Sequence, residues 1–298
     1  MESKSIFLEI NGYFSWDFTL NYLASKDEIL YKVANNTLIF LYRIENKKYL
    51  LKLEYLKEVN KLEVKILLGS GELLTKDRNI ISNFIKNWFD LDYDLKKFYD
   101  FFENDKEISN IINKSKGLRF VGTPDIYESI TWAIIGQQIS MSYAYVIKKK
   151  FIEKYGDYIL YEGDKYWCYP DPKVVSKVFE EDLKELKLSH SRIKYLLNVS
   201  QLFATGDLKK EKFNNRSKSE SINLLKEIYG IGDWTSGLVT MNSLRNHDVM
   251  LKTDAKLLNG LKKIYDLPDK PGILDLVYFE KKWGYFCDYV TFYIWANH

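Results

Sequence analysis

The sequence predicts an α+β domain followed by an all-α domain, and three observations support this fold class. The chain has 298 residues, which is enough for two domains. All 5 prolines follow residue 123, and the proline-free first third contains short apolar segments typical of strands. From about residue 94 onward, apolar residues recur at three- and four-residue spacing, as on amphipathic helices. We therefore place the α+β domain at residues 1–108 and the all-α domain at residues 109–298.

The first domain is expected to contain an antiparallel sheet. Its strand-like segments cover residues 5–10, 37–44, 48–56 and 61–69. The two middle segments are joined by a short polar connection around Asn46, which is typical of a hairpin. Helical periodicity over residues 18–25 and 77–89 predicts two helices that cover one face of the sheet.

The rest of the chain is predicted to be helical. Glycines suited to ending a helix, Gly156 and Gly206, follow two of the predicted segments. The segments with helical periodicity are 94–102, 125–155, 173–185, 192–204, 218–229, 233–244, 254–265 and 279–297. A short strand-like segment, 247–251, lies between two of them.

Composition excludes several classes of protein. Two cysteines are too few for a disulfide framework, a four-cysteine zinc site or an iron–sulfur cluster, and the three histidines are not spaced as a metal pair. The sequence has no apolar run near the ~20 residues that a membrane helix needs. We expect a cytoplasmic protein without cofactors. With 44 basic and 41 acidic residues, any nucleic acid must be bound by a local patch.

The most informative segment is the connection Gly230-Ile231-Gly232 between two predicted helices. Glycine permits a positive φ and a close backbone approach, so the N–H groups at the start of the second helix can point outward. Such a helix start binds an anion through N–H donors and the helix dipole without basic side chains. The simpler interpretation is an ordinary tight connection between helices.

An aspartate after this connection is a second candidate functional residue. Asp254 lies 24 residues after Gly230, at the head of another predicted helix. An aspartate in that position is usually only a capping residue. Here it is expected close to a loop that can hold a phosphate, and that combination is unusual.

Together these residues resemble the helix-hairpin-helix DNA glycosylases, and in particular the AlkA-type 3-methyladenine DNA glycosylases. Gly230–Thr235 is similar to the family's hairpin, and Asp254 falls where the family has its catalytic aspartate. The likeness extends over nearly the whole chain. Further matching segments are Ser15-Trp16-Asp17-Phe18, Gly117-Leu118-Arg119 with Gly122, Ala133-Ile134-Ile135-Gly136-Gln137-Gln138-Ile139-Ser140, and Tyr289-Val290-Thr291-Phe292-Tyr293-Ile294-Trp295.

The resemblance implies a fold and an activity. The fold is a TATA-binding-protein-like antiparallel sheet domain followed by a helix-hairpin-helix glycosylase domain of two helical lobes. The activity is that of a monofunctional DNA N-glycosylase in base-excision repair. Such an enzyme flips out alkylated purines of the 3-methyladenine and 7-methylguanine type and excises them by hydrolysis of the N-glycosidic bond. The partner is double-stranded DNA with a damaged base, at the nucleoid in a bacterium. The protein would act as a monomer, with no metal on side chains but room for a monovalent cation on the hairpin carbonyls.

The resemblance also assigns the site. Asp254 is the catalytic residue, and the hairpin residues Gly230, Ile231, Gly232 and Thr235 bind the DNA backbone. Trp234, Trp295, Tyr22 and Leu238 form the base pocket, where aromatic faces attract a cationic base. Gln138 fills the gap left by the flipped base. Each aromatic residue could instead be an ordinary core residue at helical spacing.

Four positions depart from the family pattern. Gln138 stands where the wedge is often leucine, and Leu238 where the pocket has an aromatic residue. Thr253 replaces a second aspartate, and Asp233 places a carboxylate beside the expected phosphate site. These departures affect the substrate range more than the chemistry.

Three other functions remain open at this point. The first is a glycosylase for another lesion, an oxidised or deaminated base. The second is a DNA-binding protein that keeps the hairpin but has no catalytic activity. Asp254 argues against this function, because a carboxylate near DNA phosphates does not help binding. A metal-dependent nuclease is disfavoured, because the sequence lacks clustered acidic ligands.

Overall fold

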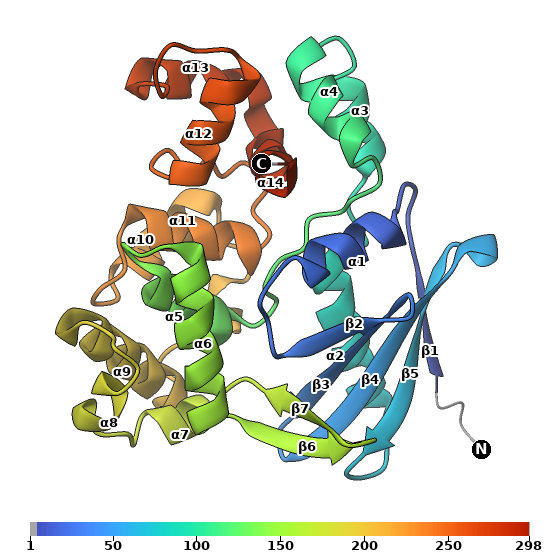
Figure 1. Cartoon of the computed structure of the whole chain (residues 1–298), viewed down its shortest axis with the longest axis vertical. Helices are drawn as coiled ribbons and strands as arrows, with labels where there is room; N and C mark the ends of the chain where they lie inside the picture. The colour runs from blue at the N-terminus through green and yellow to red at the C-terminus, as the bar shows by residue number, and fades with distance from the viewer. Residues whose placement is uncertain (1–4, 298) are drawn as a thin grey trace.

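A five-stranded antiparallel sheet forms the N-terminal part of the computed structural model, which describes residues 5–297 (Figure 1). The sheet order is β1-β5-β4-β3-β2. Its strands are β1 (Ser5–Glu9), β2 (Tyr31–Ala34), β3 (Thr37–Ile44), β4 (Lys47–Leu56) and β5 (Lys61–Gly69). The predicted hairpin is confirmed by the pairing of β3 with β4, which places Leu41 opposite Leu50. The sequence did not predict β2, which is only 4 residues long.

Helices α1 (Trp16–Ala24) and α2 (Thr75–Phe89) pack on one face of this sheet. Trp16 and Leu20 of α1 and Ile81 and Ile85 of α2 are buried with apolar residues from the strands. Alternation along each strand sends every second residue into this core. The predicted fold class of the first domain is therefore confirmed.

The remainder of the chain is helical except for one small hairpin. The helices are α3 (Leu95–Phe101), α4 (Lys106–Lys114), α5 (Ile126–Gly136), α6 (Met141–Tyr155), α7 (Pro172–Val175), α8 (Glu180–Lys184), α9 (His190–Thr205), α10 (Lys218–Lys226), α11 (Asp233–Asn242), α12 (Ala255–Ile264), α13 (Ile273–Trp283) and α14 (Cys287–Asn297). Short 3-10 helices occupy Lys57–Val59, Lys210–Phe213 and Gly284–Phe286. The hairpin consists of β6 (Asp157–Tyr161) and β7 (Asp164–Cys168).

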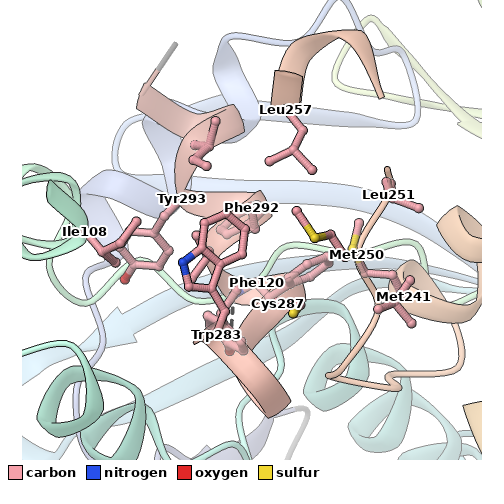
Figure 2. Packing of buried hydrophobic residues seen from close by; sticks show 14 of the residues in the cluster. Ile108, Phe120, Met241, Met250, Leu251, Leu257, Trp283, Cys287, Phe292 and Tyr293 are labelled. Atoms are coloured by element: carbon pink, nitrogen blue, oxygen red, sulfur yellow. Dashed lines mark hydrogen bonds between the residues drawn. The ribbon is translucent and has the colours of Figure 1, made fainter. Parts of the chain in front are cut away.

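Two apolar cores divide these helices into two lobes. One core lies among α5, α6 and α7 to α10, and the hairpin before α11 contributes Ile231 to it and α11 itself Val239. The other core joins α12, α13 and α14 to the rest of α11 and also to α3 and α4 (Figure 2). Its largest fully buried side chain is Trp283. The two lobes confirm the predicted fold, while the boundary at residue 108 stays a prediction, since α3 packs with the C-terminal helices.

Several local predictions differ from the structure. Residues 173–185 form two short helices, α7 and α8, residues 279–297 are divided between α13 and α14, and α4 was not predicted. Residues 125–155 form two helices, because the chain leaves the helix at Gln137 and restarts after the Ser140 N-cap. Residues 247–251 form no strand, since they have no neighbouring strand to pair with among the described residues. The β6–β7 hairpin was missed, and it packs against the sheet face opposite α1 and α2, with Tyr166 and Cys168 against Leu41 and Leu50. No described helix is long and apolar enough to span a bilayer.

Arg119 ties the linker between the two parts of the chain to its surroundings. The side chain is completely buried, and its guanidinium donates to the carbonyl oxygens of Tyr13 (3.0 Å), Asp90 (2.7 Å), Tyr93 (2.8 Å) and Asn11. These acceptors belong to the loop before α1 and to the segment after α2. Since one buried side chain donates to four carbonyls, it fixes the α+β domain against the start of the helical part.

Replacing Arg119 with leucine should therefore destabilise the whole chain. We expect the free energy of unfolding to fall by ~3 kcal/mol or more, because four carbonyls, the buried one of Asp90 among them, lose their charged donor at once. Urea unfolding measures this change. Arg216 is a matched control, since it is exposed, and Arg216→Leu should change the stability by less than ~0.5 kcal/mol. Equal effects of the two substitutions would contradict the assigned role of Arg119.

Candidate active site

The hairpin between α10 and α11 uses its two glycines differently. Gly230 has φ +92°, and a Cβ atom there would lie 2.1 Å from the ring of Tyr195, so both the conformation and the close approach require glycine. Gly232 has φ −97° and open space around it, and it stands at the N-cap of α11. Ile231 is buried beneath the hairpin. The expected positive φ therefore occurs at Gly230 and not at Gly232.

Side-chain contacts around the hairpin involve Asp233 and Thr235. Asp233 at the start of α11 is exposed and forms an ion pair with Lys226 (2.5 Å). The lysine offsets the negative charge of Asp233, which the sequence places beside the expected phosphate site. Thr235 is buried, and its hydroxyl accepts a hydrogen bond from Nε2 of Gln137 (3.2 Å). Its side chain therefore faces inward, and only its backbone is available to a ligand.

Gln137 braces the hairpin and was not singled out from the sequence. Its Nε2 also donates to the carbonyl of Gly230 (3.2 Å), so the end of α5 is fixed to the tip of the hairpin. The only sequence signal for this role was its place in the segment Gly136-Gln137-Gln138-Ile139-Ser140. The break between α5 and α6 thus has a function in the fold, since it turns Gln137 toward Gly230.

Asp254 lies at the N-cap of α12 and is held by two tryptophans. Its Oδ1 accepts hydrogen bonds from the backbone N–H of Leu257 (2.8 Å) and from Nε1 of Trp295 (3.0 Å). Its Oδ2 accepts a hydrogen bond from Nε1 of Trp234 (3.2 Å). Three helices, α11, α12 and α14, thus fix one half-buried carboxylate in position.

A cavity of about 610 Å³ opens beside this carboxylate, between the sheet domain and the helical part. Its wall includes Trp234, Leu238, Asp254, Trp295 and Tyr22, all of which the sequence assigned to the site. Phe292 also lines the cavity, and its ring meets that of Tyr22 edge-on at 5.1 Å between centroids. Burial raises the pKa of Tyr22 far above its usual value, so the phenol stays neutral.

Two lysines that the sequence reasoning missed line the same cavity. Nζ of Lys26 lies 4.2 Å from the centre of the Tyr22 ring, and Nζ of Lys256 donates to the carbonyl of Trp295 (2.6 Å). Burial and the charge of Lys256 lower the pKa of Lys26 to about 8. Burial also lowers the pKa of Lys256, although the nearby Asp254 raises it. Both amines are therefore available to a ligand that binds in the cavity beside Asp254.

The comparisons with known proteins agree with this geometry. Residues 131–274 match the HhH-GPD superfamily of base excision DNA repair proteins, and residues 5–130 match the N-terminal domain of 8-oxoguanine DNA glycosylase. A DNA-3-methyladenine glycosylase of Bacillus subtilis is 30% identical over 95% of this chain and 93% of its own length. The chain belongs to the helix-hairpin-helix family of base-excision DNA glycosylases.

Solved structures show the same fold. A 3-methyladenine DNA-glycosylase from Archaeoglobus fulgidus superimposes with a TM-score of 0.83 at 18% identity, covering 97% of each chain. An 8-oxoguanine glycosylase/lyase of Clostridium acetobutylicum, bound to double-stranded DNA, has a TM-score of 0.76 at 16% identity, covering 99% of this chain and 95% of its own. Both neighbours contain the sheet domain as well as the helical part, so the two-domain architecture is a property of the fold.

The remaining positions of the predicted glycosylase site lie outside the cavity. Gln138 is exposed in the turn between α5 and α6 with φ +56°, and it lines a shallow groove together with the hairpin residues Gly230, Ile231 and Gly232. Thr253 is exposed immediately before Asp254. The assignment of Gln138 as the wedge stays a prediction, and its place beside the hairpin is compatible with it.

The described residues contain no cluster of histidine, cysteine or acidic side chains able to hold a metal ion. Two of the hairpin carbonyls already have partners, since Gly230 accepts from Gln137 and Gly232 from the N–H of Ser236. A monovalent cation would have to use the other carbonyls of this glycosylase hairpin, and that expectation stays a prediction.

The two glycines offer a matched pair of substitutions. Gly230→Ala should lower the free energy of unfolding by ~1–3 kcal/mol and weaken binding to duplex DNA, because alanine has to adopt a positive φ and collides with Tyr195. Gly232→Ala meets open space at a negative φ and should change the stability by less than ~0.5 kcal/mol. Thermal unfolding and a DNA titration measure both effects. If Gly230→Ala proves as harmless as Gly232→Ala, the described hairpin geometry is incorrect.

Proposed function

We propose that this glycosylase family member is a monofunctional DNA N-glycosylase. It flips alkylated purines, of the 3-methyladenine and 7-methylguanine type, out of double-stranded DNA and excises them by hydrolysis of the N-glycosidic bond. It acts as a monomer in this proposal. The observation that carries the proposal is the carboxylate of Asp254, held by the indole N–H groups of Trp234 and Trp295 at the wall of an aromatic cavity. The B. subtilis relative is named for the same class of base.

The chemistry of an alkylated purine suits these residues. Alkylation at N3 or N7 gives the base a positive charge, which weakens its glycosidic bond and makes it a good leaving group. The rings of Trp234, Trp295 and Tyr22 line the cavity, and the electron-rich faces of such rings attract a cationic base. No general acid is then needed to protonate the leaving base, in contrast to sugar hydrolases that pair two carboxylates.

The reaction assigns two tasks to Asp254. The base must leave the stack and enter the cavity, which places its sugar beside the carboxylate. As the bond between C1′ and the base nitrogen breaks, its electron pair goes to the base, and positive charge develops on the sugar. Asp254 stabilises that charge, because its donors hold the carboxylate in place before the reaction. A water molecule then adds to C1′ and gives its proton to the same carboxylate.

The hairpin supplies the grip on DNA in this proposal. The first turn of α11 presents backbone N–H groups beside Gly232, and the dipole of α11 favours a phosphate there. Ile231 and Gln137 keep the hairpin in shape from beneath. Gln138, exposed beside the hairpin, fills the gap that the flipped base leaves.

A second candidate function is the excision of an oxidised purine. It is favoured by the match of residues 5–130 to the N-terminal domain of 8-oxoguanine DNA glycosylase. Oxidised guanine is neutral, so it gains less from aromatic faces than a cationic base and leaves the sugar less readily. Single-turnover base release from duplexes with one 7-methylguanine or one 8-oxoguanine separates the two candidates, and the alkylated base should be released faster by at least ~100-fold.

Asp254→Asn tests the catalytic proposal. Asparagine keeps the size and can still cap α12, so the melting temperature should change little. Loss of the charge should slow release of 7-methylguanine by about 10²- to 10³-fold, which corresponds to roughly 3–4 kcal/mol. Affinity for DNA should stay equal or rise, because one negative charge near phosphates is removed. If Asp254 only caps the helix, base release will be normal, because asparagine caps a helix as well as aspartate does.

The absence of a lyase step gives another prediction. Trp234 stands where bifunctional relatives are expected to carry a lysine that forms a Schiff base, so borohydride treatment during turnover should trap no covalent adduct. The described cavity does contain two amines with a lowered pKa, those of Lys26 and Lys256, and the pKa of Lys26 falls to about 8. A trapped adduct that disappears in Lys26→Gln but persists in Lys256→Gln would contradict the monofunctional reaction and identify the nucleophile.

A further inference from the structure

The cavity beside Asp254 extends well beyond the residues that surround a single base. Its volume of about 610 Å³ lies within the range of roughly 300–1,000 Å³ that holds a drug-sized ligand, and one methylated purine is smaller than such a ligand. Away from Asp254 the cavity is lined by Glu28, Glu128, Trp132, Tyr145, Lys148 and Tyr169. We call this end of the cavity the far chamber. It lies where the loop between α1 and β2 meets α5 and α6.

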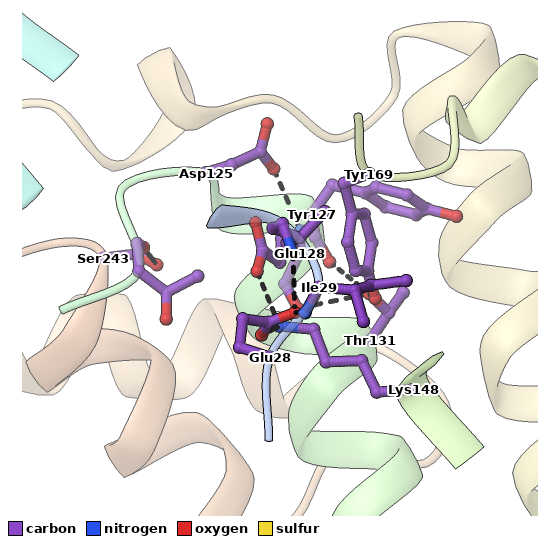
Figure 3. Close-up of polar contacts among 11 residues, drawn as sticks. Glu28, Ile29, Asp125, Tyr127, Glu128, Thr131, Lys148, Tyr169 and Ser243 are labelled. Carbon is purple, nitrogen blue, oxygen red and sulfur yellow. Dashed lines mark hydrogen bonds and ion pairs between the residues drawn. The ribbon is translucent and has the colours of Figure 1, made fainter. Parts of the chain in front are cut away.

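A buried group of three charges forms one wall of the far chamber (Figure 3). Nζ of Lys148 lies 2.6 Å from Glu28 and 2.9 Å from Glu128. The side chains of Lys148 and Glu28 are each 7% exposed, and that of Glu128 is 18% exposed. Glu28 also accepts the backbone N–H groups of Ile29 and Leu30, so its carboxylate is fixed by its own loop.

This wall is one positive charge short. Two carboxylates face one ammonium group, which leaves a formal charge of −1 in a place that is largely closed to water. Burial and the neighbouring Glu28 raise the pKa of Glu128, although Lys148 lowers it, as expected for a carboxylate that shares too little positive charge. A second cation of suitable shape would relieve this imbalance and would gain charge-assisted hydrogen bonds.

The other walls of the far chamber are aromatic and continuous with the base pocket. The ring of Tyr145 packs against Trp132, with 4.8 Å between centroids, and Lys148 lies 5.1 Å from the centre of the Trp132 ring. The hydroxyl of Tyr169 is bonded to Thr131 (2.7 Å). Tyr145 interacts electrostatically with Glu28, Glu128 and Lys148, and its proximity contributes to the raised pKa of Tyr22. It therefore lies between the two ends of the cavity.

We propose that the far chamber receives the substituent of a bulky alkylated purine, and that it favours an alkyl arm of several atoms that ends in an ammonium group. The base would stack among Trp234, Trp295 and Tyr22 as in the proposed function, on which this inference rests. The arm would run along Tyr145 and Trp132, and its ammonium group would donate to Glu28 and Glu128. The enzyme would thus select large cationic adducts in addition to methylated bases.

Three duplexes, each with one modified guanine, test the inference on the intact protein. The N7 substituent is methyl in the first, n-butyl in the second and 4-aminobutyl in the third. Single-turnover release should be about as fast for aminobutyl as for methyl, and about tenfold or more faster for aminobutyl than for butyl, because only the amine can make charge-assisted hydrogen bonds. This comparison needs no variant.

A substitution then locates the effect. Glu128→Gln keeps an acceptor for Lys148 and balances the remaining pair, so the advantage of aminobutyl over butyl should fall to about threefold or less. Release of the methylated base and the melting temperature should not change. Glu153→Gln, on the exposed side of α6, is the matched control and should leave all three rates unchanged.

Each outcome decides between the proposals. Release of methylguanine with rejection of both long arms, or equal release of the butyl and aminobutyl bases, overturns the inference and leaves the proposed function intact. If the advantage of aminobutyl survives Glu128→Gln undiminished, the far chamber is not its source and the inference is overturned. If the methylated base itself is not released, the proposed function fails first.

Discussion

The site depends on one constraint, which is that a single ionised carboxylate must be held in a half-enclosed cavity. Asp254 meets it with one backbone N–H and two indole N–H donors from three different helices. Such donors stabilise the charge without neutralising it, whereas a lysine in place of Trp234 would form an ion pair and oppose a cationic base. The aromatic rings that carry two of these donors also form the wall on which the base can stack, so electrostatics and base recognition share the same residues.

The rest of the fold positions these donors. Trp234 belongs to the second helix of the hairpin, so the group that grips DNA and the group that orients the carboxylate lie on one rigid element, α11. Trp295 lies on α14, whose preceding turns are buried in the core with α3 and α4. Tyr22 reaches the cavity from the sheet domain, and Arg119 fixes that domain in place through four carbonyls. The cavity therefore exists only when both domains are docked.

The sequence predicted what local patterns encode. The β3–β4 hairpin followed from apolar alternation around a polar turn, and the lobes and the hairpin at Gly230 followed from helical spacing and from resemblance to the family. It missed the β6–β7 hairpin. The buried residues of this hairpin pack against the sheet face opposite α1 and α2, a contact between segments distant in the chain. It also missed Gln137, Lys26 and the Lys148–Glu28–Glu128 group, because each depends on contacts between segments distant in the chain. The sequence assigned Thr235 to the residues that bind the DNA backbone, and the burial of its side chain against Gln137 became visible only in three dimensions.

The central claim is that Asp254 recognises positive charge on the sugar rather than the DNA itself. The most direct measurement compares two duplexes with identical sequence, one with a neutral tetrahydrofuran in place of the damaged nucleotide and one with a protonated pyrrolidine. Because a transition-state analogue gains from the same interaction as the transition state, the pyrrolidine duplex should bind at least ~100-fold more tightly. This preference should disappear in Asp254→Asn. Equal affinity of the unmodified protein for both duplexes would contradict the account.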